Sequence, residues 1–305
     1  MGAGAPSGPA SPAPILILGM HRSGTSLLTR VLAQAGLFLG RSVNAEDEAR
    51  LFLTLNDWIL DNLSAHWDRP PSQEATHFDP QFLTALAGHV RTYMGLPFSL
   101  GYLGVARAAA GSPAGLARPW GWKDPRSTYT WPVWRQLFPE ARLIHMVRHG
   151  ADVAASLATR SERLCRSLEN APSAGARVRW LTGRRNRLME AATMMAPEAA
   201  LALWSDYVTT AQGHIAAAGP RGLQVRFEDL MTQPERVLAD ILAFCDLRVA
   251  PERHKRLTRT FVPERAFAYR HDARWQALAS AHEALLRRHG YSAATSMPAA
   301  AVAEP

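Results

Sequence analysis

The chain has 305 residues, of which 47% are hydrophobic and 20% charged, and its formal net charge is +8. The hydrophobic fraction is typical of a folded globular protein, and the length allows one large α/β domain or two smaller ones. Two cysteines, Cys165 and Cys245, exclude a disulfide framework and a cysteine-based zinc site, and they favour a reducing compartment.

The positive charge is almost entirely arginine, because Lys123 and Lys255 are the only lysines. Guanidinium groups match the oxygens of phosphate and sulfate in pairs, so the excess favours an anionic ligand or partner. A composition rich in alanine and arginine throughout would produce the same excess without a ligand. The arginines are scattered and no zinc-finger, RRM or basic-zipper signature occurs, so nucleic acid is not the expected partner.

The two ends of the chain differ in composition from the rest. We predict a disordered lead over residues 1–14, one domain over 15–292 and a disordered tail over 293–305. The lead is uncharged and lacks the long apolar core of a signal peptide. No apolar run approaches the ~18 residues that a membrane span requires. These features predict a soluble, cytoplasmic protein.

The first predicted element is a short apolar strand, Ile15–Leu18, that runs directly into a loop with glycines at Gly19 and Gly24. Apolar residues at helical spacing follow the loop, and Gly36 provides a stop. A strand, loop and helix of this kind place backbone N–H groups around a phosphate at the helix N-terminus. The alternative is an ordinary turn whose glycines only relieve backbone strain.

The spacing of the loop is close to the Walker A pattern, G-x-x-x-x-G-K-[ST], with two departures. Thr25 occupies the position of the lysine, and the cation lies inside the loop at Arg22. A kinase or ATPase uses that lysine for the β- and γ-phosphates and the next hydroxyl for Mg²⁺. The loop therefore favours phosphate binding without the kinase arrangement.

The remaining elements alternate between helices and strands. The periodicity predicts a helix over 51–62, two weak helices between 80 and 110, a strand over 120–123, a helix over 132–138, a strand over 142–147 and a helix that contains Val153 and Leu157. Farther on we expect helical residues over 177–217 with a break at Pro197, a strand over 223–227, a helix over 234–244 with a capping box of Thr232 and Glu235, and a helix over 274–289. This order predicts an α/β fold, a single domain with a central parallel sheet flanked by helices.

Four segments resemble motifs of the sulfotransferase superfamily. Gly19 to Leu28 resembles its 5′-phosphosulfate loop, and Arg148 through Ser156 resembles its 3′-phosphate motif. Trp122-Lys123-Asp124-Pro125-Arg126, ahead of Leu137-Phe138-Pro139, is similar to a stretch of the tyrosylprotein branch and its bacterial relatives, to which the resemblance is nearest. Val225-Arg226-Phe227-Glu228-Asp229-Leu230, with Pro234-Glu235 after it, is similar to the strand and turn that family members carry downstream. Together they span about Ile15 to Asp246, and they imply the P-loop NTPase-like sulfotransferase fold.

The resemblance also implies a role for each matching residue. The co-substrate would be 3′-phosphoadenosine 5′-phosphosulfate (PAPS), with no metal. Its 5′-phosphate and sulfuryl group would be held by the loop residues His21, Arg22, Ser23, Gly24, Thr25 and Ser26. Its 3′-phosphate would be held by Arg148 and Ser156, assisted by Arg160, while Lys123 would lie near the bridging oxygen. Phe227 replaces a tyrosine that touches the nucleotide in the tyrosylprotein branch, so the base is expected on a ring face. Arg265 and Arg270 are the candidates for a C-terminal closing segment.

An acceptor hydroxyl needs a general base within hydrogen-bond reach. In the tyrosylprotein branch the base is a glutamate after the loop helix, a region that here contains Glu46, Asp47 and Glu48. We expect Glu48, with Asp47 and then His21 as alternatives. The fixed cations Arg22 and Lys123 suit the charge that develops on the departing phosphate. His145 and His149 are four apart on a strand, a spacing that does not converge on zinc.

These features together predict a PAPS-dependent sulfotransferase that acts on a hydroxyl of a small molecule, lipid or glycan. A P-loop kinase-like phosphotransferase and a non-catalytic anion- or nucleic-acid-binding protein are the alternatives. The aromatic residues Trp58, Trp67, Tyr93 and Trp120 would either line an apolar acceptor pocket or belong to the core. The sequence is compatible with a monomer or a homodimer.

Overall fold

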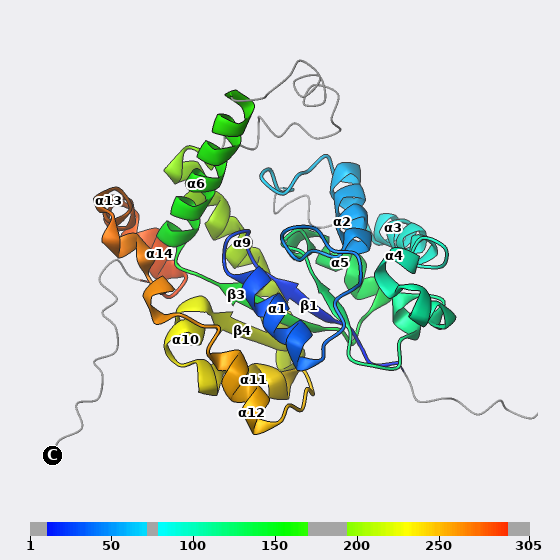
Figure 1. The fold of residues 1–305 in the computed structure, drawn as a ribbon. Coiled ribbons are helices and arrows are strands. Elements are labelled where there is room, and N and C mark those ends of the chain that lie inside the picture. The colour runs from blue at the N-terminus through cyan, green and yellow to red at the C-terminus, as the bar shows by residue number, and fades with distance from the viewer. Residues whose placement is uncertain (1–10, 72–78, 170–193, 292–305) are drawn as a thin grey trace, which may run out of the picture.

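The structure, a computed structural model, describes residues 11–71, 79–169 and 194–291. Within these residues four parallel strands form one sheet in the order β2-β1-β3-β4. The strands are β1 (Ile15–Leu18), β2 (Gly121–Lys123), β3 (Arg142–Val147) and β4 (Gly222–Arg226). The predicted α/β fold with a central parallel sheet is confirmed (Figure 1).

The sheet order brings the ends of distant segments to one edge. β1 lies in the centre, where all four of its residues are buried, and it pairs with β2 on one side and β3 on the other. A strand covered on both faces requires a continuous apolar run, which Ile15–Leu18 supplies. Because all pairs are parallel, the residues that follow Leu18, Lys123, Val147 and Arg226 meet at the carboxyl edge. Ligands of open α/β sheets bind at this edge.

Helices cover both faces of the sheet. The longer helices are α1 (Thr25–Ala35), α2 (Arg50–Asn62), α3 (Pro80–Tyr93), α5 (Ser127–Leu137), α6 (Gly150–Glu169), α9 (Pro197–Ala218), α11 (Pro234–Phe244), α12 (Pro251–Thr258) and α13 (Ala273–Ala281). The shorter ones are α4 (Leu100–Leu103), α10 (Phe227–Thr232) and α14 (Glu283–Arg288), with 3₁₀ turns η2 (Val105–Ala110), η3 (Pro113–Gly115), η4 (Gly219–Arg221), η5 (Pro263–Arg265) and η6 (Ala268–His271).

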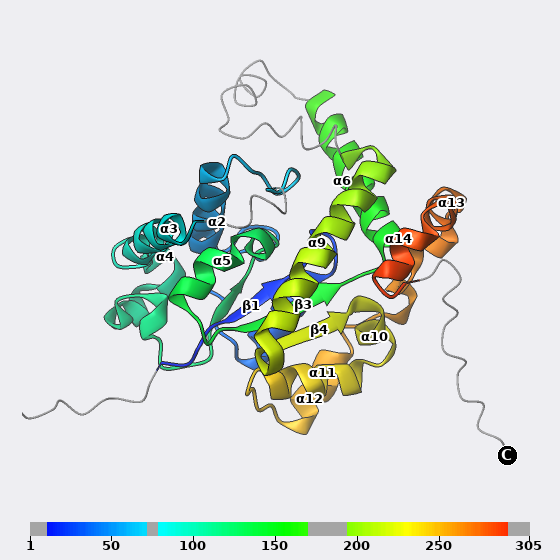
Figure 2. The ribbon, with the colours of Figure 1, turned by 180° about the vertical axis from the view of Figure 1, so that it is seen from behind.

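The two faces carry different helices. α1, α11 and α12 pack on one face, in front in Figure 1, around Ile15, Ile17 and Ile144. α5 and α9 cover the other face, in front in Figure 2. α6 leaves the carboxyl end of β3 and packs against α9 and α13. The first turns of α1 and α6 therefore lie at the edge where the strands end.

Most predicted elements are confirmed, but one helix begins earlier than the sequence predicts. The helix predicted over 132–138 begins at Ser127, which places Pro132 inside α5. A proline there lacks the N–H that would bond the carbonyl of Thr128 four residues earlier. His214 of α9 donates its Nε2–H to that carbonyl at 2.8 Å instead. A tertiary contact thus satisfies the group that proline leaves free, and the helix continues through it.

Two further predictions are wrong in detail. The capping box of Thr232 and Glu235 does not form, because Thr232 ends the unexpected helix α10 and donates its hydroxyl to the Glu228 carbonyl at 2.9 Å. Gln233 is the N-cap of α11, and its side chain makes no capping hydrogen bond. The helix predicted over 274–289 is two helices, α13 and α14, that are separated at His282, whose φ of −114° and ψ of 28° are not helical.

Some predictions concern the ends of the chain and residues outside the description. Residues 1–10 of the predicted lead, residues 292–305 and the predicted helical stretch 177–193 lie outside the described residues. Residues 11–14 are held to the domain, since Trp120 Nε1 donates to the Pro12 carbonyl at 2.9 Å. Cys165 and Cys245 are free thiols. Across 11–71, 79–169 and 194–291, no helix combines the length and apolarity needed to cross a membrane.

Candidate active site

The loop between β1 and α1 presents the N-terminus of α1 at the carboxyl edge of the sheet (Figure 1). Gly24 has a φ of +93°, and a Cβ there would lie 2.4 Å from the Phe227 ring, so only glycine fits without a shift. As the N-cap of α1, Gly24 offers no side chain to the amides of the first helical turn. The Leu27 amide donates to the Gly24 carbonyl at 3.0 Å, so the amides of Thr25 and Ser26 are the ones that an anion would reach.

Arg22 joins this loop to α6. Its Nε donates a hydrogen bond to Ser156 Oγ at 2.8 Å, across 134 positions of sequence. Partial removal from water, and then the charges of Arg160, Arg148 and Arg163, lower the pKa of Arg22 from its usual value. Clustered cations destabilise one another, and a bound anion relieves that repulsion. The two predicted phosphate motifs therefore converge on one strongly positive place.

Lys123, at the end of β2, reaches the same place from the other side. Its side chain is almost fully buried, and Nζ lies 3.2 Å from Glu48 Oε1. Nζ also donates to the backbone carbonyl of Glu46. Glu48 is 3% exposed and accepts a hydrogen bond from Asn44 Nδ2 at 2.9 Å through its other oxygen. A buried ammonium and a buried carboxylate thus stand beside the anion-binding loop.

Arg126 contacts the carboxylate of this pair. Its Nη1 lies 3.0 Å from Asp124 Oδ1 and 3.6 Å from Glu48 Oε2, and its Nε lies 2.8 Å from Asp57 Oδ1. Burial acts against the charge, but the carboxylates of Asp124 and Glu48 outweigh it and raise the pKa of Arg126. Paired buried charges of this kind fix side-chain positions. Arg126 therefore holds Glu48 in its orientation toward Lys123.

Arg148 follows β3 directly and lies over Phe227. Its guanidinium carbon is 4.5 Å from the ring centre. Its Nη2 lies 3.3 Å from Asp152 Oδ2 and donates to the Arg265 carbonyl at 3.2 Å. Within the described residues, Arg148 Nε is buried and has no hydrogen-bond partner. A buried donor without a partner is costly, so this atom points to a ligand that would accept from it.

His21, within the loop, packs against Trp67. The two rings meet edge to face, with centres 4.6 Å apart. Burial, followed by the charges of Arg126, Arg160 and Lys123, lowers the pKa of His21 well below its usual value. Its Nε2 is buried and makes no hydrogen bond to any described residue. His21 is therefore a neutral imidazole with one free nitrogen.

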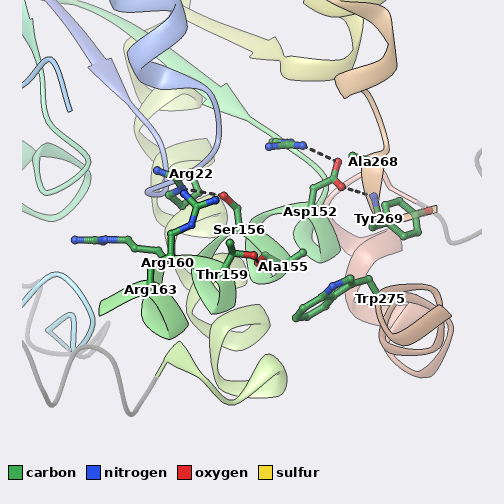
Figure 3. A pocket seen from close by; sticks show the side chains of 11 residues that line it. Arg22, Asp152, Ala155, Ser156, Thr159, Arg160, Arg163, Ala268, Tyr269 and Trp275 are labelled. Atoms are coloured by element: carbon green, nitrogen blue, oxygen red, sulfur yellow. Dashed lines mark hydrogen bonds and ion pairs between the residues drawn. The ribbon is translucent and has the colours of Figure 1, made fainter. Parts of the chain in front are cut away.

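These side chains line two adjoining cavities. The first has a volume of about 310 Å³ and extends from the loop to Lys123, Glu48 and Arg265. The second, of about 390 Å³, runs along α6 and is shown in Figure 3. Four side chains border both cavities: Arg22, Arg148, Ser156 and Arg160.

Comparison with known proteins decides the family. The model of the sulfotransferase family matches residues 14–251. The chain belongs to the sulfotransferase family. A search of curated proteins gave no significant match.

Solved structures similar to this sulfotransferase-family chain include three sulfotransferases. The sulfotransferase domain of the Synechococcus PCC 7002 olefin synthase is 19% identical, with 97% of this chain and 92% of that one covered and a TM-score of 0.43. A sulfotransferase from Alicyclobacillus acidocaldarius is 16% identical, with 87% and 99% covered and a TM-score of 0.43. A sulfotransferase from Mycobacterium avium is 16% identical, with 83% and 68% covered and a TM-score of 0.42.

Most residues that the sequence predicts for the sulfotransferase site border the first cavity. They are His21, Arg22, Gly24, Thr25, Ser26, Glu48, Lys123, Arg148, Ser156, Arg160 and Phe227. The side chains of three predicted residues are buried or engaged by other parts of the protein. Ser23 is buried within the loop, and the Ser26 hydroxyl donates to the Glu46 carbonyl at 2.6 Å. Asp47 forms an ion pair with Arg30 at 2.6 Å and is not among the described lining residues.

Phe227 and the two C-terminal candidates differ in their surroundings. Phe227 is fully buried, between Gly24 and the Arg148 guanidinium. Arg265 lines the first cavity, whereas the Arg270 guanidinium stacks on the Phe267 ring at 4.5 Å. The nucleotide contact predicted for Phe227 would therefore need a ring edge, because Arg148 covers one face.

The aromatic residues considered for an acceptor pocket do not form one group. Trp67 and Trp120 are buried in different parts of the core, and Trp58 is partly buried against the part that contains Trp120. Tyr93 is 38% exposed and stacks on Phe98. Core positions account for Trp67 and Trp120.

Sequence reasoning missed several residues of the site. Arg126 lies in the quoted segment Trp122 to Arg126, but nothing in that segment reveals its buried carboxylate partners. Asp152 lies four residues after Arg148, one helical turn apart, which could have suggested the ion pair. Arg163 lies a further turn beyond Arg160 on α6, where it lines the second cavity. Among the described residues, no three His, Cys, Asp or Glu side chains gather as a metal site.

Proposed function

We propose that the protein transfers the sulfuryl group of PAPS to an acceptor hydroxyl. The observation that carries the proposal is the convergence of the two phosphate motifs, which the 2.8 Å bond between Arg22 and Ser156 joins. PAPS carries anionic groups at both ends of its ribose. The donor set fits it: free amides at the start of α1 suit the 5′ end, and the partnerless Nε of Arg148 suits the 3′-phosphate.

In the proposed reaction the acceptor oxygen bonds to sulfur as the bond from sulfur to the 5′-phosphate oxygen breaks. 3′-Phosphoadenosine 5′-phosphate (PAP) leaves, and the acceptor proton passes to a base. Negative charge develops on the departing phosphate and the equatorial oxygens, as in phosphoryl transfer. Arg22 and Lys123 border the cavity as fixed cations for that charge, and cations positioned in advance stabilise the transition state without reorganisation during the reaction.

We assign the base to Glu48. Its carboxylate borders the first cavity, 3.2 Å from Lys123, and Asn44 and Arg126 orient it. Asp47 is engaged by Arg30. His21 is the second candidate, favoured by its neutral imidazole and its free Nε2.

The acceptor that we propose is a hydroxyl of a small molecule, lipid or glycan, in the cytoplasm. The protein would act as a monomer or homodimer, without nucleic acid. The experiment incubates it with ³⁵S-labelled PAPS and fractionated metabolite extracts in the presence of EDTA, and separates labelled products. Label in an acceptor, at a rate that EDTA does not change, is expected.

The same experiment separates the alternatives. A P-loop kinase-like phosphotransferase would need Mg²⁺, and it would transfer ³²P from ATP, with EDTA abolishing the transfer. A non-catalytic anion-binding protein would bind PAP yet label nothing in any extract. Either result would overturn the proposed function.

A further inference from the structure

The second cavity contains a buried carboxylate that the predicted site does not use. Asp152 lies on the first turn of α6 and is 3% exposed. Its Oδ1 accepts a hydrogen bond from the Tyr269 backbone N–H at 2.6 Å. Its Oδ2 lies 3.3 Å from Arg148 Nη2. Figure 3 shows Asp152 beside the C-terminal segment and its contact with Tyr269.

These contacts join two walls of one cavity. The first wall is α6 with Arg148 and Ser156, and the second is the segment Ala268–Tyr269 with Trp275 behind it. Tyr269 is 117 residues from Asp152 in sequence, so no local structure holds the walls together at this place. The Asp152 carboxylate is thus one of the contacts between these walls, beside the His149 ring that stacks on Tyr269 with centres 4.2 Å apart.

The freedom of Arg148 is limited in a particular way. Nη2 is directed toward Asp152 and the Arg265 carbonyl, and the guanidinium plane is held over Phe227. Nε remains without a partner among the described residues. A guanidinium that is anchored by one nitrogen presents its other donors in a fixed direction, which reduces the entropy lost when a phosphate binds.

A carboxylate this close to a phosphate subsite would repel the ligand if it faced it. Asp152 Oδ1 instead accepts from a backbone N–H, and Oδ2, which makes no hydrogen bond to the described residues, forms an ion pair with the arginine at 3.3 Å. Burial raises the pKa of Asp152, and the charge of Arg148 offsets part of that cost, so the carboxylate acts on the ligand by aiming a cation. The contacts suit a supporting residue, not a ligand contact.

We propose that Asp152 is a positioning residue that gives the site its selectivity for nucleotides with a 3′-phosphate, by fixing Arg148 against the Ala268–Tyr269 backbone. The inference rests on the proposed function, since it concerns the 3′-phosphate of the same nucleotide. It makes a specific claim, because the loss of Asp152 should affect only ligands that carry that phosphate.

The test compares two nucleotides that differ only in the 3′-phosphate, PAP and adenosine 5′-phosphate. Their dissociation constants are measured by calorimetry for the wild type and for Asp152→Asn, which keeps the size of the side chain but removes its charge. We expect PAP binding to weaken roughly 10- to 100-fold, the scale of a lost charge-assisted hydrogen bond, and adenosine 5′-phosphate binding to change less than about threefold.

Glu228 offers a matched control. It is a buried carboxylate that also joins the end of β3 to the C-terminal segment, since it accepts from His149 N at 2.8 Å and from the Tyr291 hydroxyl at 2.9 Å. Neither of these hydrogen bonds involves Arg148 or Tyr269. Glu228→Gln should keep the ratio of the two affinities. An equal loss for both nucleotides in Asp152→Asn, or an equal fall of the ratio in Glu228→Gln, would overturn the inference.

A measurement on the unmodified protein keeps the inference testable if Asp152→Asn does not fold. PAP should slow hydrogen exchange of the 265–270 backbone, and adenosine 5′-phosphate should not, because only a 3′-phosphate reaches Arg148 and the facing wall. Equal protection by both nucleotides would contradict the inference. A wild type that binds neither nucleotide would instead overturn the proposed function itself.

Discussion

Arg22 Nε and Ser156 Oγ lie 2.8 Å apart although 134 residues separate them in the chain. Arg22 belongs to the loop after β1, and Ser156 lies in the second turn of α6, so the bond closes the gap between two strand ends of the sheet. Each of the two residues borders both cavities. The bond therefore lies between the proposed sites for the 5′ and 3′ ends of the nucleotide.

Ser156→Ala should weaken PAP binding about fivefold. The substitution removes the acceptor of the Arg22 bond and one hydroxyl from the proposed 3′-phosphate contacts, and a hydrogen bond contributes about 1 kcal/mol. Thr92→Ala on α3 is the control, since its exposed hydroxyl only donates to the Gly88 carbonyl. Calorimetry with PAP gives both values. Unchanged PAP affinity in Ser156→Ala would exclude Ser156 from the phosphate site.

Lys123→Ala should lower kcat by about 10²- to 10³-fold and leave PAP affinity within a few-fold. Lys123 is expected to act on charge that develops in the transition state, and such a contact affects turnover more than ground-state binding. Lys255, the other lysine of the chain, is exposed on α12 and provides the control Lys255→Ala. A loss of PAP binding as large as the loss of kcat would show that Lys123 binds the ground state instead.

The base is identified by three substitutions that preserve size. We expect Glu48→Gln to lower kcat by about 10²- to 10⁴-fold, the range of general-base catalysis, and Asp47→Asn to change it less than about fivefold. His21→Gln tests the second candidate. If His21 were the base, its low pKa would keep it active as a base at pH values well below 6.5. A full loss in His21→Gln with activity retained in Glu48→Gln would move the assignment to His21.

The sequence predicted the parts of the site that local patterns specify. β1 is a continuous apolar run and β3 a nearly continuous one, interrupted at His145, because both faces of the sheet are covered, and Gly19 and Gly24 stand where the backbone has a positive φ. The sequence could not predict where α5 begins. Pro132 is a typical helix start, and the donor that lets α5 continue through it comes from His214 on another helix.

Local sequence patterns could not predict the partners of the buried charges either, because those partners come from distant segments. Asp152 and Tyr269 are 117 residues apart, and Lys123 and Glu48 are 75 apart, so each pair exists only once the sheet has brought its segments together. A resemblance could name Lys123 and Glu48 because it carries such distant pairings with it. No quoted motif contained Tyr269, and its link to Asp152 needed coordinates.

Gly24→Ala should destabilise the protein more than Gly36→Ala. Both glycines have a positive φ, +93° and +116°, which costs an L-residue about 1 kcal/mol. An added Cβ at Gly24 would also lie 2.4 Å from the Phe227 ring, whereas one at Gly36 would meet nothing within 4 Å. Overpacking adds about 1–3 kcal/mol. Denaturant unfolding measures both, and equal losses would show that Phe227 moves aside freely.

The stability of the protein should fall as the pH drops from 7.5 to 5, in part because of His145. This side chain is fully buried on β3, and burial lowers the pKa of His145 to about 4. Below the unfolded value of about 6.5, the unfolded chain takes up a proton that the folded protein does not, so unfolding becomes more favourable. The expected contribution is about 2 kcal/mol at pH 5, from about 1.4 kcal/mol per pH unit.

His145→Met isolates this contribution, because burial raises the pKa of Glu228 and Asp124 and those groups act in the opposite direction. The free energy of unfolding is measured by denaturant titration at pH 7.5 and pH 5 for the wild type, His145→Met and the exposed control His271→Met. The difference between the two pH values should become about 2 kcal/mol smaller in His145→Met and stay unchanged in His271→Met. An identical pH dependence in all three proteins would mean that His145 takes up its proton in the folded state as readily as in the unfolded chain.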